Sequence, residues 1–388
     1  MRRHPLRFAP IAGFALALAS SALARPLAAQ SSQFGVRGLG LPGRALSTRA
    51  MGTGGGFGLF DAGSSLNPAS IGEYTALTAT FGLLQNYRKS ENPSGSESGR
   101  DTRFPQIAVA GPLKRIPISL GASFSTYTNR DFSLATSGTE VVRGAPVDFA
   151  DTLTSRGGIS DLRVAGAYRV SERFSFGVAV HALTGVNRSE LRRTFGDTTY
   201  RSIRQRAEVS YAGVGFGTGV LLRVRPNLTF AAVGRRDGHV GVERDSTSVG
   251  DIDMPYLIGG GLRWRPVPRL DIAGHLLFRG WSRSDAGLRA FGGTGADNTA
   301  EGALGLELVR STRRPTTLPI RLGARWSSLP FPVIEGEQPS ELSFAAGTGI
   351  RFADSRGGID VALERVRRRA GAYRETAWLV SLGVTVRP

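Results

Sequence analysis

Residues 76–388 repeat one pattern, in which roughly ten residues alternate between apolar and polar or small side chains before a turn or loop. Alternation with a period of two places every second side chain on the same face of a β-strand. Between 160 and 170, Leu162 and Val164 share one face, whereas Arg163 and Ala165 share the other. One face of each predicted strand is therefore apolar, and the opposite face is polar or small.

The pattern predicts about fourteen strands, the even number that a closed antiparallel bacterial barrel requires when both ends lie on one side. The seventh is the weakest, because Arg235, Arg236 and Asp237 interrupt its alternation. No stretch after the N-terminal thirty or so residues is apolar for long enough to be a transmembrane helix. The predicted fold is all-β, a transmembrane antiparallel barrel. Its strands lie around 77–84, 104–110, 118–126, 160–170, 174–180, 212–222, 228–234, 256–264, 270–278, 300–308, 320–326, 342–352, 359–363 and 378–386.

The links between these strands alternate in length, as expected for outer-membrane barrels with short periplasmic turns and long extracellular loops. Two links break the rule, because 310–319 is long for a turn and 367–374 is short for an outer loop. The short links are 112–117, 171–173, 225–227, 265–269 and 353–358. The long links are 86–103, 129–157, 186–205, 235–253, 282–298 and 327–340.

Residues 1–29 have the three parts of a secretory signal peptide. Arg2 and Arg3 supply a positive start, an apolar run covers 8–19, and small residues follow, so cleavage after Ala24 or near Ala29 fits. A membrane anchor is the alternative, but a spanning helix needs about 20 apolar residues. We therefore expect export and a location in the bacterial outer membrane.

The formal net charge is +18, nearly all of it from arginine, and the chain has no cysteine. Disulfides and cysteine-based metal sites are therefore excluded. The arginines are scattered along an exported chain, which argues against a nucleic-acid binder. Two explanations of the arginine excess remain open: a coding bias, or arginines at loop bases that meet anionic lipid headgroups or line a pore.

Several charged residues fall on the inward face of the predicted strands, with opposite signs on neighbouring strands. They either brace the wall as ion pairs or bind the carboxylate head of a ligand. The arginines are Arg163, Arg263, Arg321, Arg325 and Arg351, and the acids include Glu307, Asp360 and Glu364.

Aromatic residues gather at the strand ends, where outer-membrane barrels carry an aromatic girdle at each interface. Tyr256, Trp326 and Trp378 fall at the outer ends, and Trp264 falls at an inner end.

Enzymatic chemistry is not expected, because His181, His239 and His275 have no recognisable nucleophile beside them. We also expect no cofactor and no metal site.

Residues 30–75 are rich in glycine and small polar residues and show no sustained alternation. An irregular segment of this kind either hangs free or packs inside the hydrated lumen. It runs from Arg49-Ala50-Met51-Gly52 through Asp61 and Ser65 to Asn67-Pro68-Ala69 and Ile71, just before the first strand. Asn-Pro alone is a common turn.

This run of residues resembles the FadL-like family of outer-membrane proteins, which includes long-chain fatty acid transporters, aromatic-hydrocarbon transporters and type IX secretion relatives. The resemblance covers Asp61, Ser65, Asn67, Pro68 and Ala69. It implies that residues 30–75 form a hatch inside a fourteen-stranded barrel of residues 76–388.

The resemblance further implies passive uptake of hydrophobic compounds such as long-chain fatty acids. The alternative is a barrel component or shuttle of a protein-secretion or surface-attachment system, and a general porin comes third. Transport predicts a continuous apolar pocket between hatch and wall, whereas a shuttle predicts a polar, filled lumen. The expected partners of this monomeric barrel are outer-membrane lipid, lipopolysaccharide, a hydrophobic small-molecule ligand and the barrel-assembly machinery.

Overall fold

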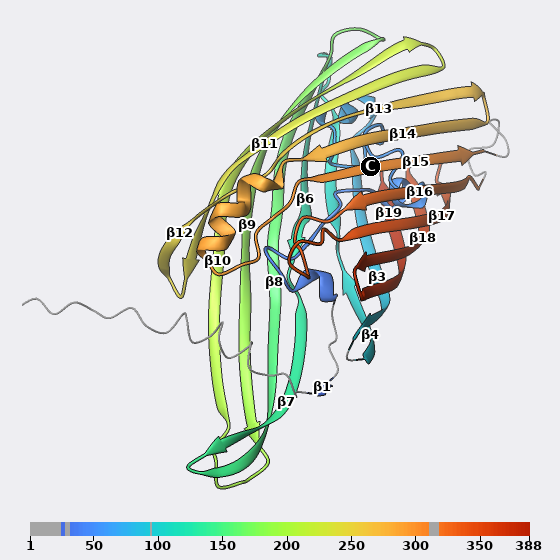
Figure 1. The fold of residues 1–388 in the computed structure, drawn as a ribbon. Coiled ribbons are helices and arrows are strands. Elements are labelled where there is room, and N and C mark those ends of the chain that lie inside the picture. Colours follow the sequence, from blue (N-terminus) through green and yellow to red (C-terminus); the bar gives the residue numbers. More distant parts are fainter. Residues whose placement is uncertain (1–24, 28–31, 94, 310–317) are drawn as a thin grey trace, which may run out of the picture.

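The wall is one closed antiparallel sheet. The computed structural model describes residues 25–27, 32–93, 95–309 and 318–388. Fourteen strands pair in sequence order, and β19 pairs with β3 to close the ring (Figure 1). They are β3 (Thr78–Asn92), β5 (Gln106–Pro112), β6 (Ile118–Asn129), β8 (Ala145–Arg169), β9 (Phe174–Phe195), β10 (Ile203–Arg225), β11 (Leu228–Arg244), β13 (Tyr256–Val267), β14 (Leu270–Arg279), β15 (Thr299–Leu308), β16 (Ile320–Ser328), β17 (Ser340–Phe352), β18 (Gly357–Ala370) and β19 (Tyr373–Val386).

The two faces of the sheet differ as the alternation predicts. Val164 and Leu304 point outward and are 60% and 61% exposed, whereas Arg163 and Ala165 point inward and are 4% exposed. Closure pairs the backbone polar groups of every strand with a neighbour, which the interior of a membrane demands. The predicted fourteen-stranded barrel is confirmed. Among the described residues, no helix has the length and apolar character to cross a membrane.

Four links predicted as loops are instead largely strand. Residues 86–103, 129–157, 186–205 and 235–253 lengthen the barrel strands and add β4 (Gly95–Arg103), β7 (Phe132–Val142) and β12 (Thr247–Asp253). β8 alone has 25 residues, about 80 Å of chain, against an apolar membrane thickness of about 30 Å. These hairpins extend the wall beyond the membrane. Their outer face carries charged residues such as Arg188 and Glu208, so the regular alternation of the membrane-spanning strands is lost.

The seventh strand was predicted to stop near residue 234, which is wrong. β11 continues through Arg235 and Asp237 to Arg244. Both side chains turn inward, and the Arg235 guanidinium bonds to Asp161 and Asp237 at 2.6 and 2.8 Å. A charge that has a partner inside the lumen does not end a strand. The link at 282–298, in turn, contains η3 (Trp281–Ser284) and α3 (Asp285–Ala290).

Residues 32–75, here called the N-terminal segment, run inside the ring from the long-loop end to the short-turn end (Figure 1). Ser32 contacts Glu375 near the long loops, and Gly72 accepts a hydrogen bond from Arg169 at the opposite end. The segment contains η1 (Gln33–Gly35), β2 (Leu41–Pro42), α2 (Thr48–Gly52) and η2 (Pro68–Glu73). The predicted signal peptide, residues 1–29, lies outside the described residues except for β1 (Arg25–Leu27), which pairs with β7.

The path of the segment can be tested with single cysteines, because the chain has none of its own. In intact cells, we expect a membrane-impermeant maleimide to label Gln33→Cys and Arg204→Cys, which lie at the long-loop end. Lys114→Cys, in a short turn, should react only after the outer membrane is permeabilised. Labelling of Lys114→Cys in intact cells together with protection of Arg204→Cys would reverse the orientation.

Candidate functional site

The wall contacts the N-terminal segment closely because it has glycine where the segment's backbone approaches. A Cβ atom at Gly219 would lie 2.0 Å from Asn67 Oδ1, and one at Gly177 would lie 2.4 Å from the Ala69 nitrogen. At Gly323, a Cβ would lie 2.0 Å from the Thr53 carbonyl oxygen. Real Cβ atoms do not approach other atoms so closely, so these positions admit only glycine while the segment stays in place.

Asn67 is fully buried and fixes the start of η2. Its Oδ1 accepts a hydrogen bond from the Ala69 nitrogen at 3.0 Å. Its Nδ2 donates to the carbonyl of Leu59 at 3.1 Å and to that of Val220 on β10 at 3.3 Å. Pro68 follows as the first residue of η2, a position where its missing N–H costs no bond. One amide side chain thus caps a helix and joins it to the wall.

The other predicted motif residues, Asp61, Ser65 and Ala69, lie on both sides of Asn67 and Pro68 in the segment. Asp61 accepts a hydrogen bond from Ser47, and its carboxylate is 3.6 Å from the Arg49 guanidinium. Ser65 donates to Ser123 Oγ on β6 at 2.9 Å. Ala69 is fully buried. Asp61 therefore connects two parts of the N-terminal segment, whereas Ser65 and Asn67 connect the segment to the barrel wall.

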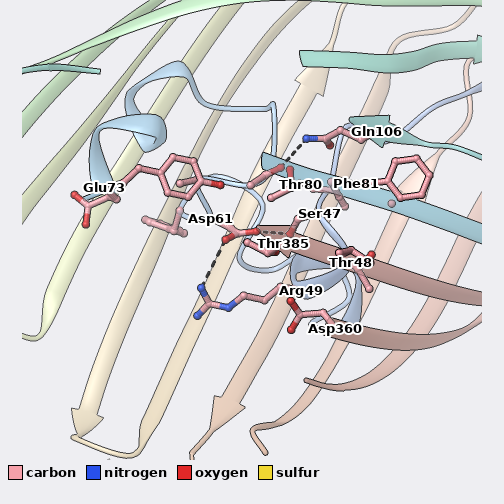
Figure 2. Close-up of a pocket in the computed structure, with 18 of the residues that line it drawn as sticks. Ser47, Thr48, Arg49, Asp61, Glu73, Thr80, Phe81, Gln106, Asp360 and Thr385 are labelled. Carbon is pink, nitrogen blue, oxygen red and sulfur yellow. Dashed lines mark hydrogen bonds and ion pairs between the residues drawn. The ribbon is translucent and has the colours of Figure 1, made fainter. Parts of the chain in front are cut away.

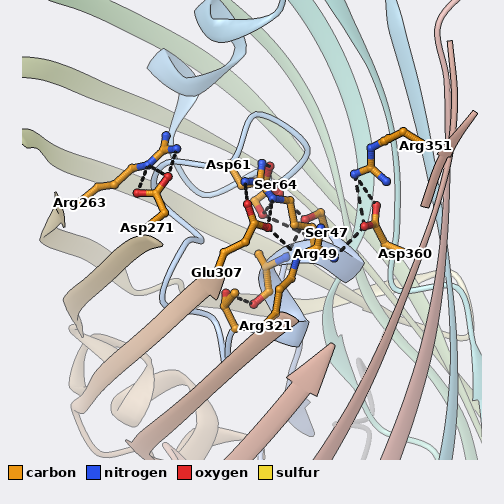
Figure 3. A network of polar contacts seen from close by, with 12 residues as sticks. Ser47, Arg49, Asp61, Ser64, Arg263, Asp271, Glu307, Arg321, Arg351 and Asp360 are labelled. Atoms are coloured by element: carbon orange, nitrogen blue, oxygen red, sulfur yellow. Dashed lines mark hydrogen bonds and ion pairs between the residues drawn. The ribbon is translucent and has the colours of Figure 1, made fainter. Parts of the chain in front are cut away.

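Two arginines of the segment make paired hydrogen bonds with acids of the wall. Arg44 donates to both oxygens of Glu364 at 3.0 and 2.5 Å. Arg49 donates to both oxygens of Glu307 at 3.0 and 2.7 Å, as Figure 3 shows. Bidentate pairs of this kind are among the strongest polar contacts in proteins. Thr48 adds a hydroxyl contact of 2.9 Å with Ser381.

Four of the five predicted lumen arginines have acidic partners on neighbouring strands. Arg321 contacts Glu307 at 2.6 Å and Asp360 at 2.8 Å, and Arg351 contacts Asp360 at 3.0 Å. In a separate part of the lumen, Arg263 contacts Asp271 at 2.5 Å (Figure 3). Arg325 contacts Glu341. Their charges are thus already neutralised within the wall.

Arg163, the fifth, differs from the other four. It is buried, and its Nε and Nη2 atoms have no hydrogen-bond partner among the described residues. Near it, His181 Nδ1 lies 2.9 Å from Asp161, which also accepts from Arg235. The described residues contain no cluster of three metal-ligating side chains.

An apolar cluster fills the lumen toward the long loops. Trp281 and Phe331 pack edge to face with ring centroids 5.2 Å apart, and Gly38 of the N-terminal segment lies against the Phe331 ring. Beside them, Asp285 of α3 accepts hydrogen bonds from Arg289 and from the Ala296 nitrogen. Both contacts hold the pKa of Asp285 below its usual value. The remaining members of the cluster are Leu39, Ile159, Leu183, Tyr211, Val240, Val242, Ile252, Met254, Leu288 and Ala296.

A cavity of about 270 Å³ lies between the N-terminal segment and the wall, toward the short turns (Figure 2). Arg49, Asp61 and Glu73 line it on one side, and Thr80 and Phe81 of β3 line it on the other. Its lining is mixed and charged. A continuous apolar pocket, which we expected of a transporter, is not what this cavity provides.

An apolar depression of about 390 Å³ lies on the outer face of the same strands. Thr80 and Phe81 of β3 and Val384 of β19 line both the depression and the inner cavity. The ladder is interrupted here: β3 pairs with β5 only as far as Phe81, and its pairing with β4 begins at Leu84. Among the described residues, Gly82 and Leu83 therefore have no partner on the β5 side of β3, while β3 remains paired with β19 through this stretch.

Three of the four predicted girdle residues face the membrane. Trp264, Trp326 and Trp378 are 45%, 50% and 42% exposed. Tyr256 is half-buried, with its ring against Gly280. The Arg365 guanidinium lies 4.8 Å from the centre of the Trp378 ring.

The sequence analysis did not single out Arg44 and Arg49 as contact residues. A signal was present, because an arginine in a segment destined for a lumen requires an acid nearby, and Glu307 and Glu364 were placed on the inward face. The sequence does not show how the N-terminal segment is aligned with the strands of the wall, so it could not assign each arginine to its acid.

A closed fourteen-stranded barrel with an apolar outer belt and a buried N-terminal segment defines a fold of the FadL type, that of outer-membrane barrels. Solved structures with this fold include a Pseudomonas aeruginosa FadL homologue, with 11% identity, a TM-score of 0.60, and coverage of 89% of this chain and 99% of that one. The Ralstonia pickettii toluene transporter TbuX has 14% identity and a TM-score of 0.53, over 89% and 99% of the two chains. The monoaromatic hydrocarbon channel CymD has 14% identity and a TM-score of 0.55, over 88% and 97%.

The sequence resemblance to the FadL-like family is confirmed at the level of the fold. The model of the BamG family matches residues 12–232, more than half of the chain. The protein belongs to the BamG family. No curated protein matches the sequence.

The close contact between the wall glycines and the N-terminal segment can be tested at Gly219. We expect Gly219→Ala to push Asn67 away from β10 and to lower the free energy of unfolding by about 1–3 kcal/mol, the usual effect of overpacking. Gly166→Ala is the matched control, because a Cβ there meets only Leu120, at 3.5 Å. The measurement is urea unfolding of the refolded barrel in detergent. Equal stability of the two variants would contradict the proposed contact.

Proposed function

We propose that the protein takes up hydrophobic compounds passively across the outer membrane. The proposal rests on two hollows, one on the inner and one on the outer face of the wall, which share Thr80, Phe81 and Val384 next to the gap in the β3–β5 ladder. A greasy molecule that leaves the lumen sideways at this point enters the membrane without crossing water. Small hydrophobic compounds and long-chain fatty acids are the two candidate ligand classes. Similarity of fold to hydrocarbon channels supports transport in general.

In this proposal the N-terminal segment acts as the hatch. Arg49, Asp61 and Tyr74 of the segment line the small cavity, so a ligand that comes from the long-loop end reaches it only when the segment shifts. The lumen arginines Arg263, Arg321, Arg325 and Arg351 brace the wall, because their partners are acids of the barrel rather than a ligand. No catalytic role is proposed for any residue.

We further propose that the chain is exported by a cleaved signal peptide, is inserted by the barrel-assembly machinery, and works as a monomer in contact with lipid and lipopolysaccharide. The apolar outer belt supports the contact with lipid, and its clearest members are Val164, Leu276 and Leu304. Trp264, Trp326 and Trp378 are assigned to the membrane interfaces.

A second candidate function, a role in protein secretion or surface attachment, is supported by a different observation. Around Arg44 and Arg49 the lumen is polar and rich in ion pairs, and β8, β9 and β10 extend the wall far beyond the membrane on the long-loop side (Figure 1). Both features suit a barrel that serves as a component or shuttle in protein secretion or surface attachment. Such a barrel needs partners at its long-loop end and no passage through its wall.

Uptake of labelled toluene and labelled oleate by cells that express the protein separates the two functions. We expect uptake above cells lacking the protein, and we expect Thr80→Trp to abolish it by filling the cavity at the wall. Leu304→Trp is the control, because Leu304 faces the membrane on the far strand β15. Absence of ligand-dependent uptake by the wild type, with the barrel correctly inserted, would favour the secretion role.

A further inference from the structure

The short turns of the barrel carry exposed basic side chains. Lys114 and Arg115 lie between β5 and β6, and Arg173 lies between β8 and β9. Arg225 ends β10, Arg269 precedes β14 and Arg356 precedes β18. Because antiparallel neighbours reverse direction, all of these turns lie at one end of the barrel. These six residues are called the short-turn rim.

The charges of the short-turn rim have no acidic partner within the part of the chain that the structure describes. At the long-loop end, some exposed arginines pair with acids, whereas Arg143, Arg192 and Arg201 form no ion pair among the described residues. Arg188 contacts Glu208 at 2.7 Å, and Arg204 contacts Glu190 at 2.7 Å. Near the short turns, Arg223 and Arg265 also pair with Glu73 and Asp271, so the six cations of the short-turn rim are among those at that end that stay unpaired within the described ranges.

Exposed apolar side chains accompany the basic residues in the same turns. Leu113 and Ile116 flank Lys114 and Arg115, and are 40% and 47% exposed. Val224 precedes Arg225 and is 47% exposed, and Val267 lies two residues before Arg269 and is 52% exposed. These apolar side chains continue the outer belt, so the cations lie at its border. Lipid phosphate groups occupy that depth of a membrane.

We propose that the short-turn rim binds the phosphate groups of anionic phospholipids in the adjoining leaflet. Lipid surrounds a barrel on all sides, and the rim residues are likewise distributed over successive turns rather than gathered on one arc. An acidic protein partner would contact one arc of the barrel and would not require the exposed apolar side chains in the turns of Lys114, Arg225 and Arg269. The rim is independent of the proposed uptake route, and it accounts for part of the arginine excess.

Lipid retention by the full-length protein in detergent tests this assignment. The protein is incubated with phosphatidylglycerol, with phosphatidylcholine or with inorganic phosphate, and the bound molecules are counted by native mass spectrometry. We expect preferential retention of phosphatidylglycerol that weakens as salt rises. Equal retention of the two lipids would overturn the proposal. Retention of inorganic phosphate in place of lipid would also overturn it.

The rim variant combines Lys114→Gln, Arg173→Gln, Arg225→Gln and Arg269→Gln. We expect it to bind phosphatidylglycerol at least about tenfold more weakly, since each basic residue near an anionic surface adds to affinity. The control combines Arg188→Gln, Arg192→Gln, Arg204→Gln and Arg206→Gln, which removes the same charge from the long-loop end. Wild-type binding by the rim variant, or an equal loss in the control, would overturn the proposal.

A double variant keeps the proposal testable if the fourfold rim variant does not fold. Arg225→Gln with Arg269→Gln alters only two exposed side chains, and heat-dependent gel migration reports whether the barrel has formed. We expect an intermediate loss of phosphatidylglycerol binding from this folded variant. Unchanged binding would count against the short-turn rim.

Discussion

A ring of fourteen strands encloses more space than its own inward side chains can fill, and the rest of this structure depends on how that space is used. Eight strands leave just enough room for side chains, whereas sixteen or more leave a water-filled channel. Here the N-terminal segment occupies the difference. Glycines such as Gly219 and Gly323 let the two backbones approach, so the wall fits the segment. Arginine pairs with Glu307 and Glu364 then hold it there.

The polar character of the lumen follows from the same constraint. An irregular segment exposes backbone groups and charges that lipid could not accept, but a lumen rich in acids and arginines can. Because buried charges are costly when unpaired, the pairs at Arg44 and Arg49 favour one position of the segment. A ligand that passes must therefore displace ordered contacts. In the proposed uptake, the ligand leaves through the hollows on the two faces of β3 once the segment has moved.

Much of the wall could be predicted from the sequence, because a strand between lipid and lumen has a different environment on each face. Leu162, which faces outward, and Arg163, which faces the lumen, show this difference in two consecutive residues. Beyond the membrane the outer face carries charged side chains instead of apolar ones, so the extended ends of β8 to β11 were taken for loops. Arg235 and Asp237 were read as a break because their partners Asp161 and Tyr127 lie on other strands, β8 and β6.

The site was harder to predict than the wall. Asn67-Pro68-Ala69 stood out because a cap and a proline have local signatures, and Asn67 does cap η2. The contact of Asn67 with Val220, however, depends on a register 153 residues away in the sequence. Contacts of this kind come from the closure of the ring, which no local pattern encodes.

A disulfide between the segment and the wall tests the proposed gate most directly. Thr48 Oγ1 and Ser381 Oγ lie 2.9 Å apart, and the chain has no other cysteine to compete. In Thr48→Cys/Ser381→Cys, oxidation should cross-link the segment to β19 and stop uptake of hydrophobic ligand, and a reductant should restore it. Full uptake by the completely cross-linked protein would contradict the account, because the N-terminal segment would then have no need to move.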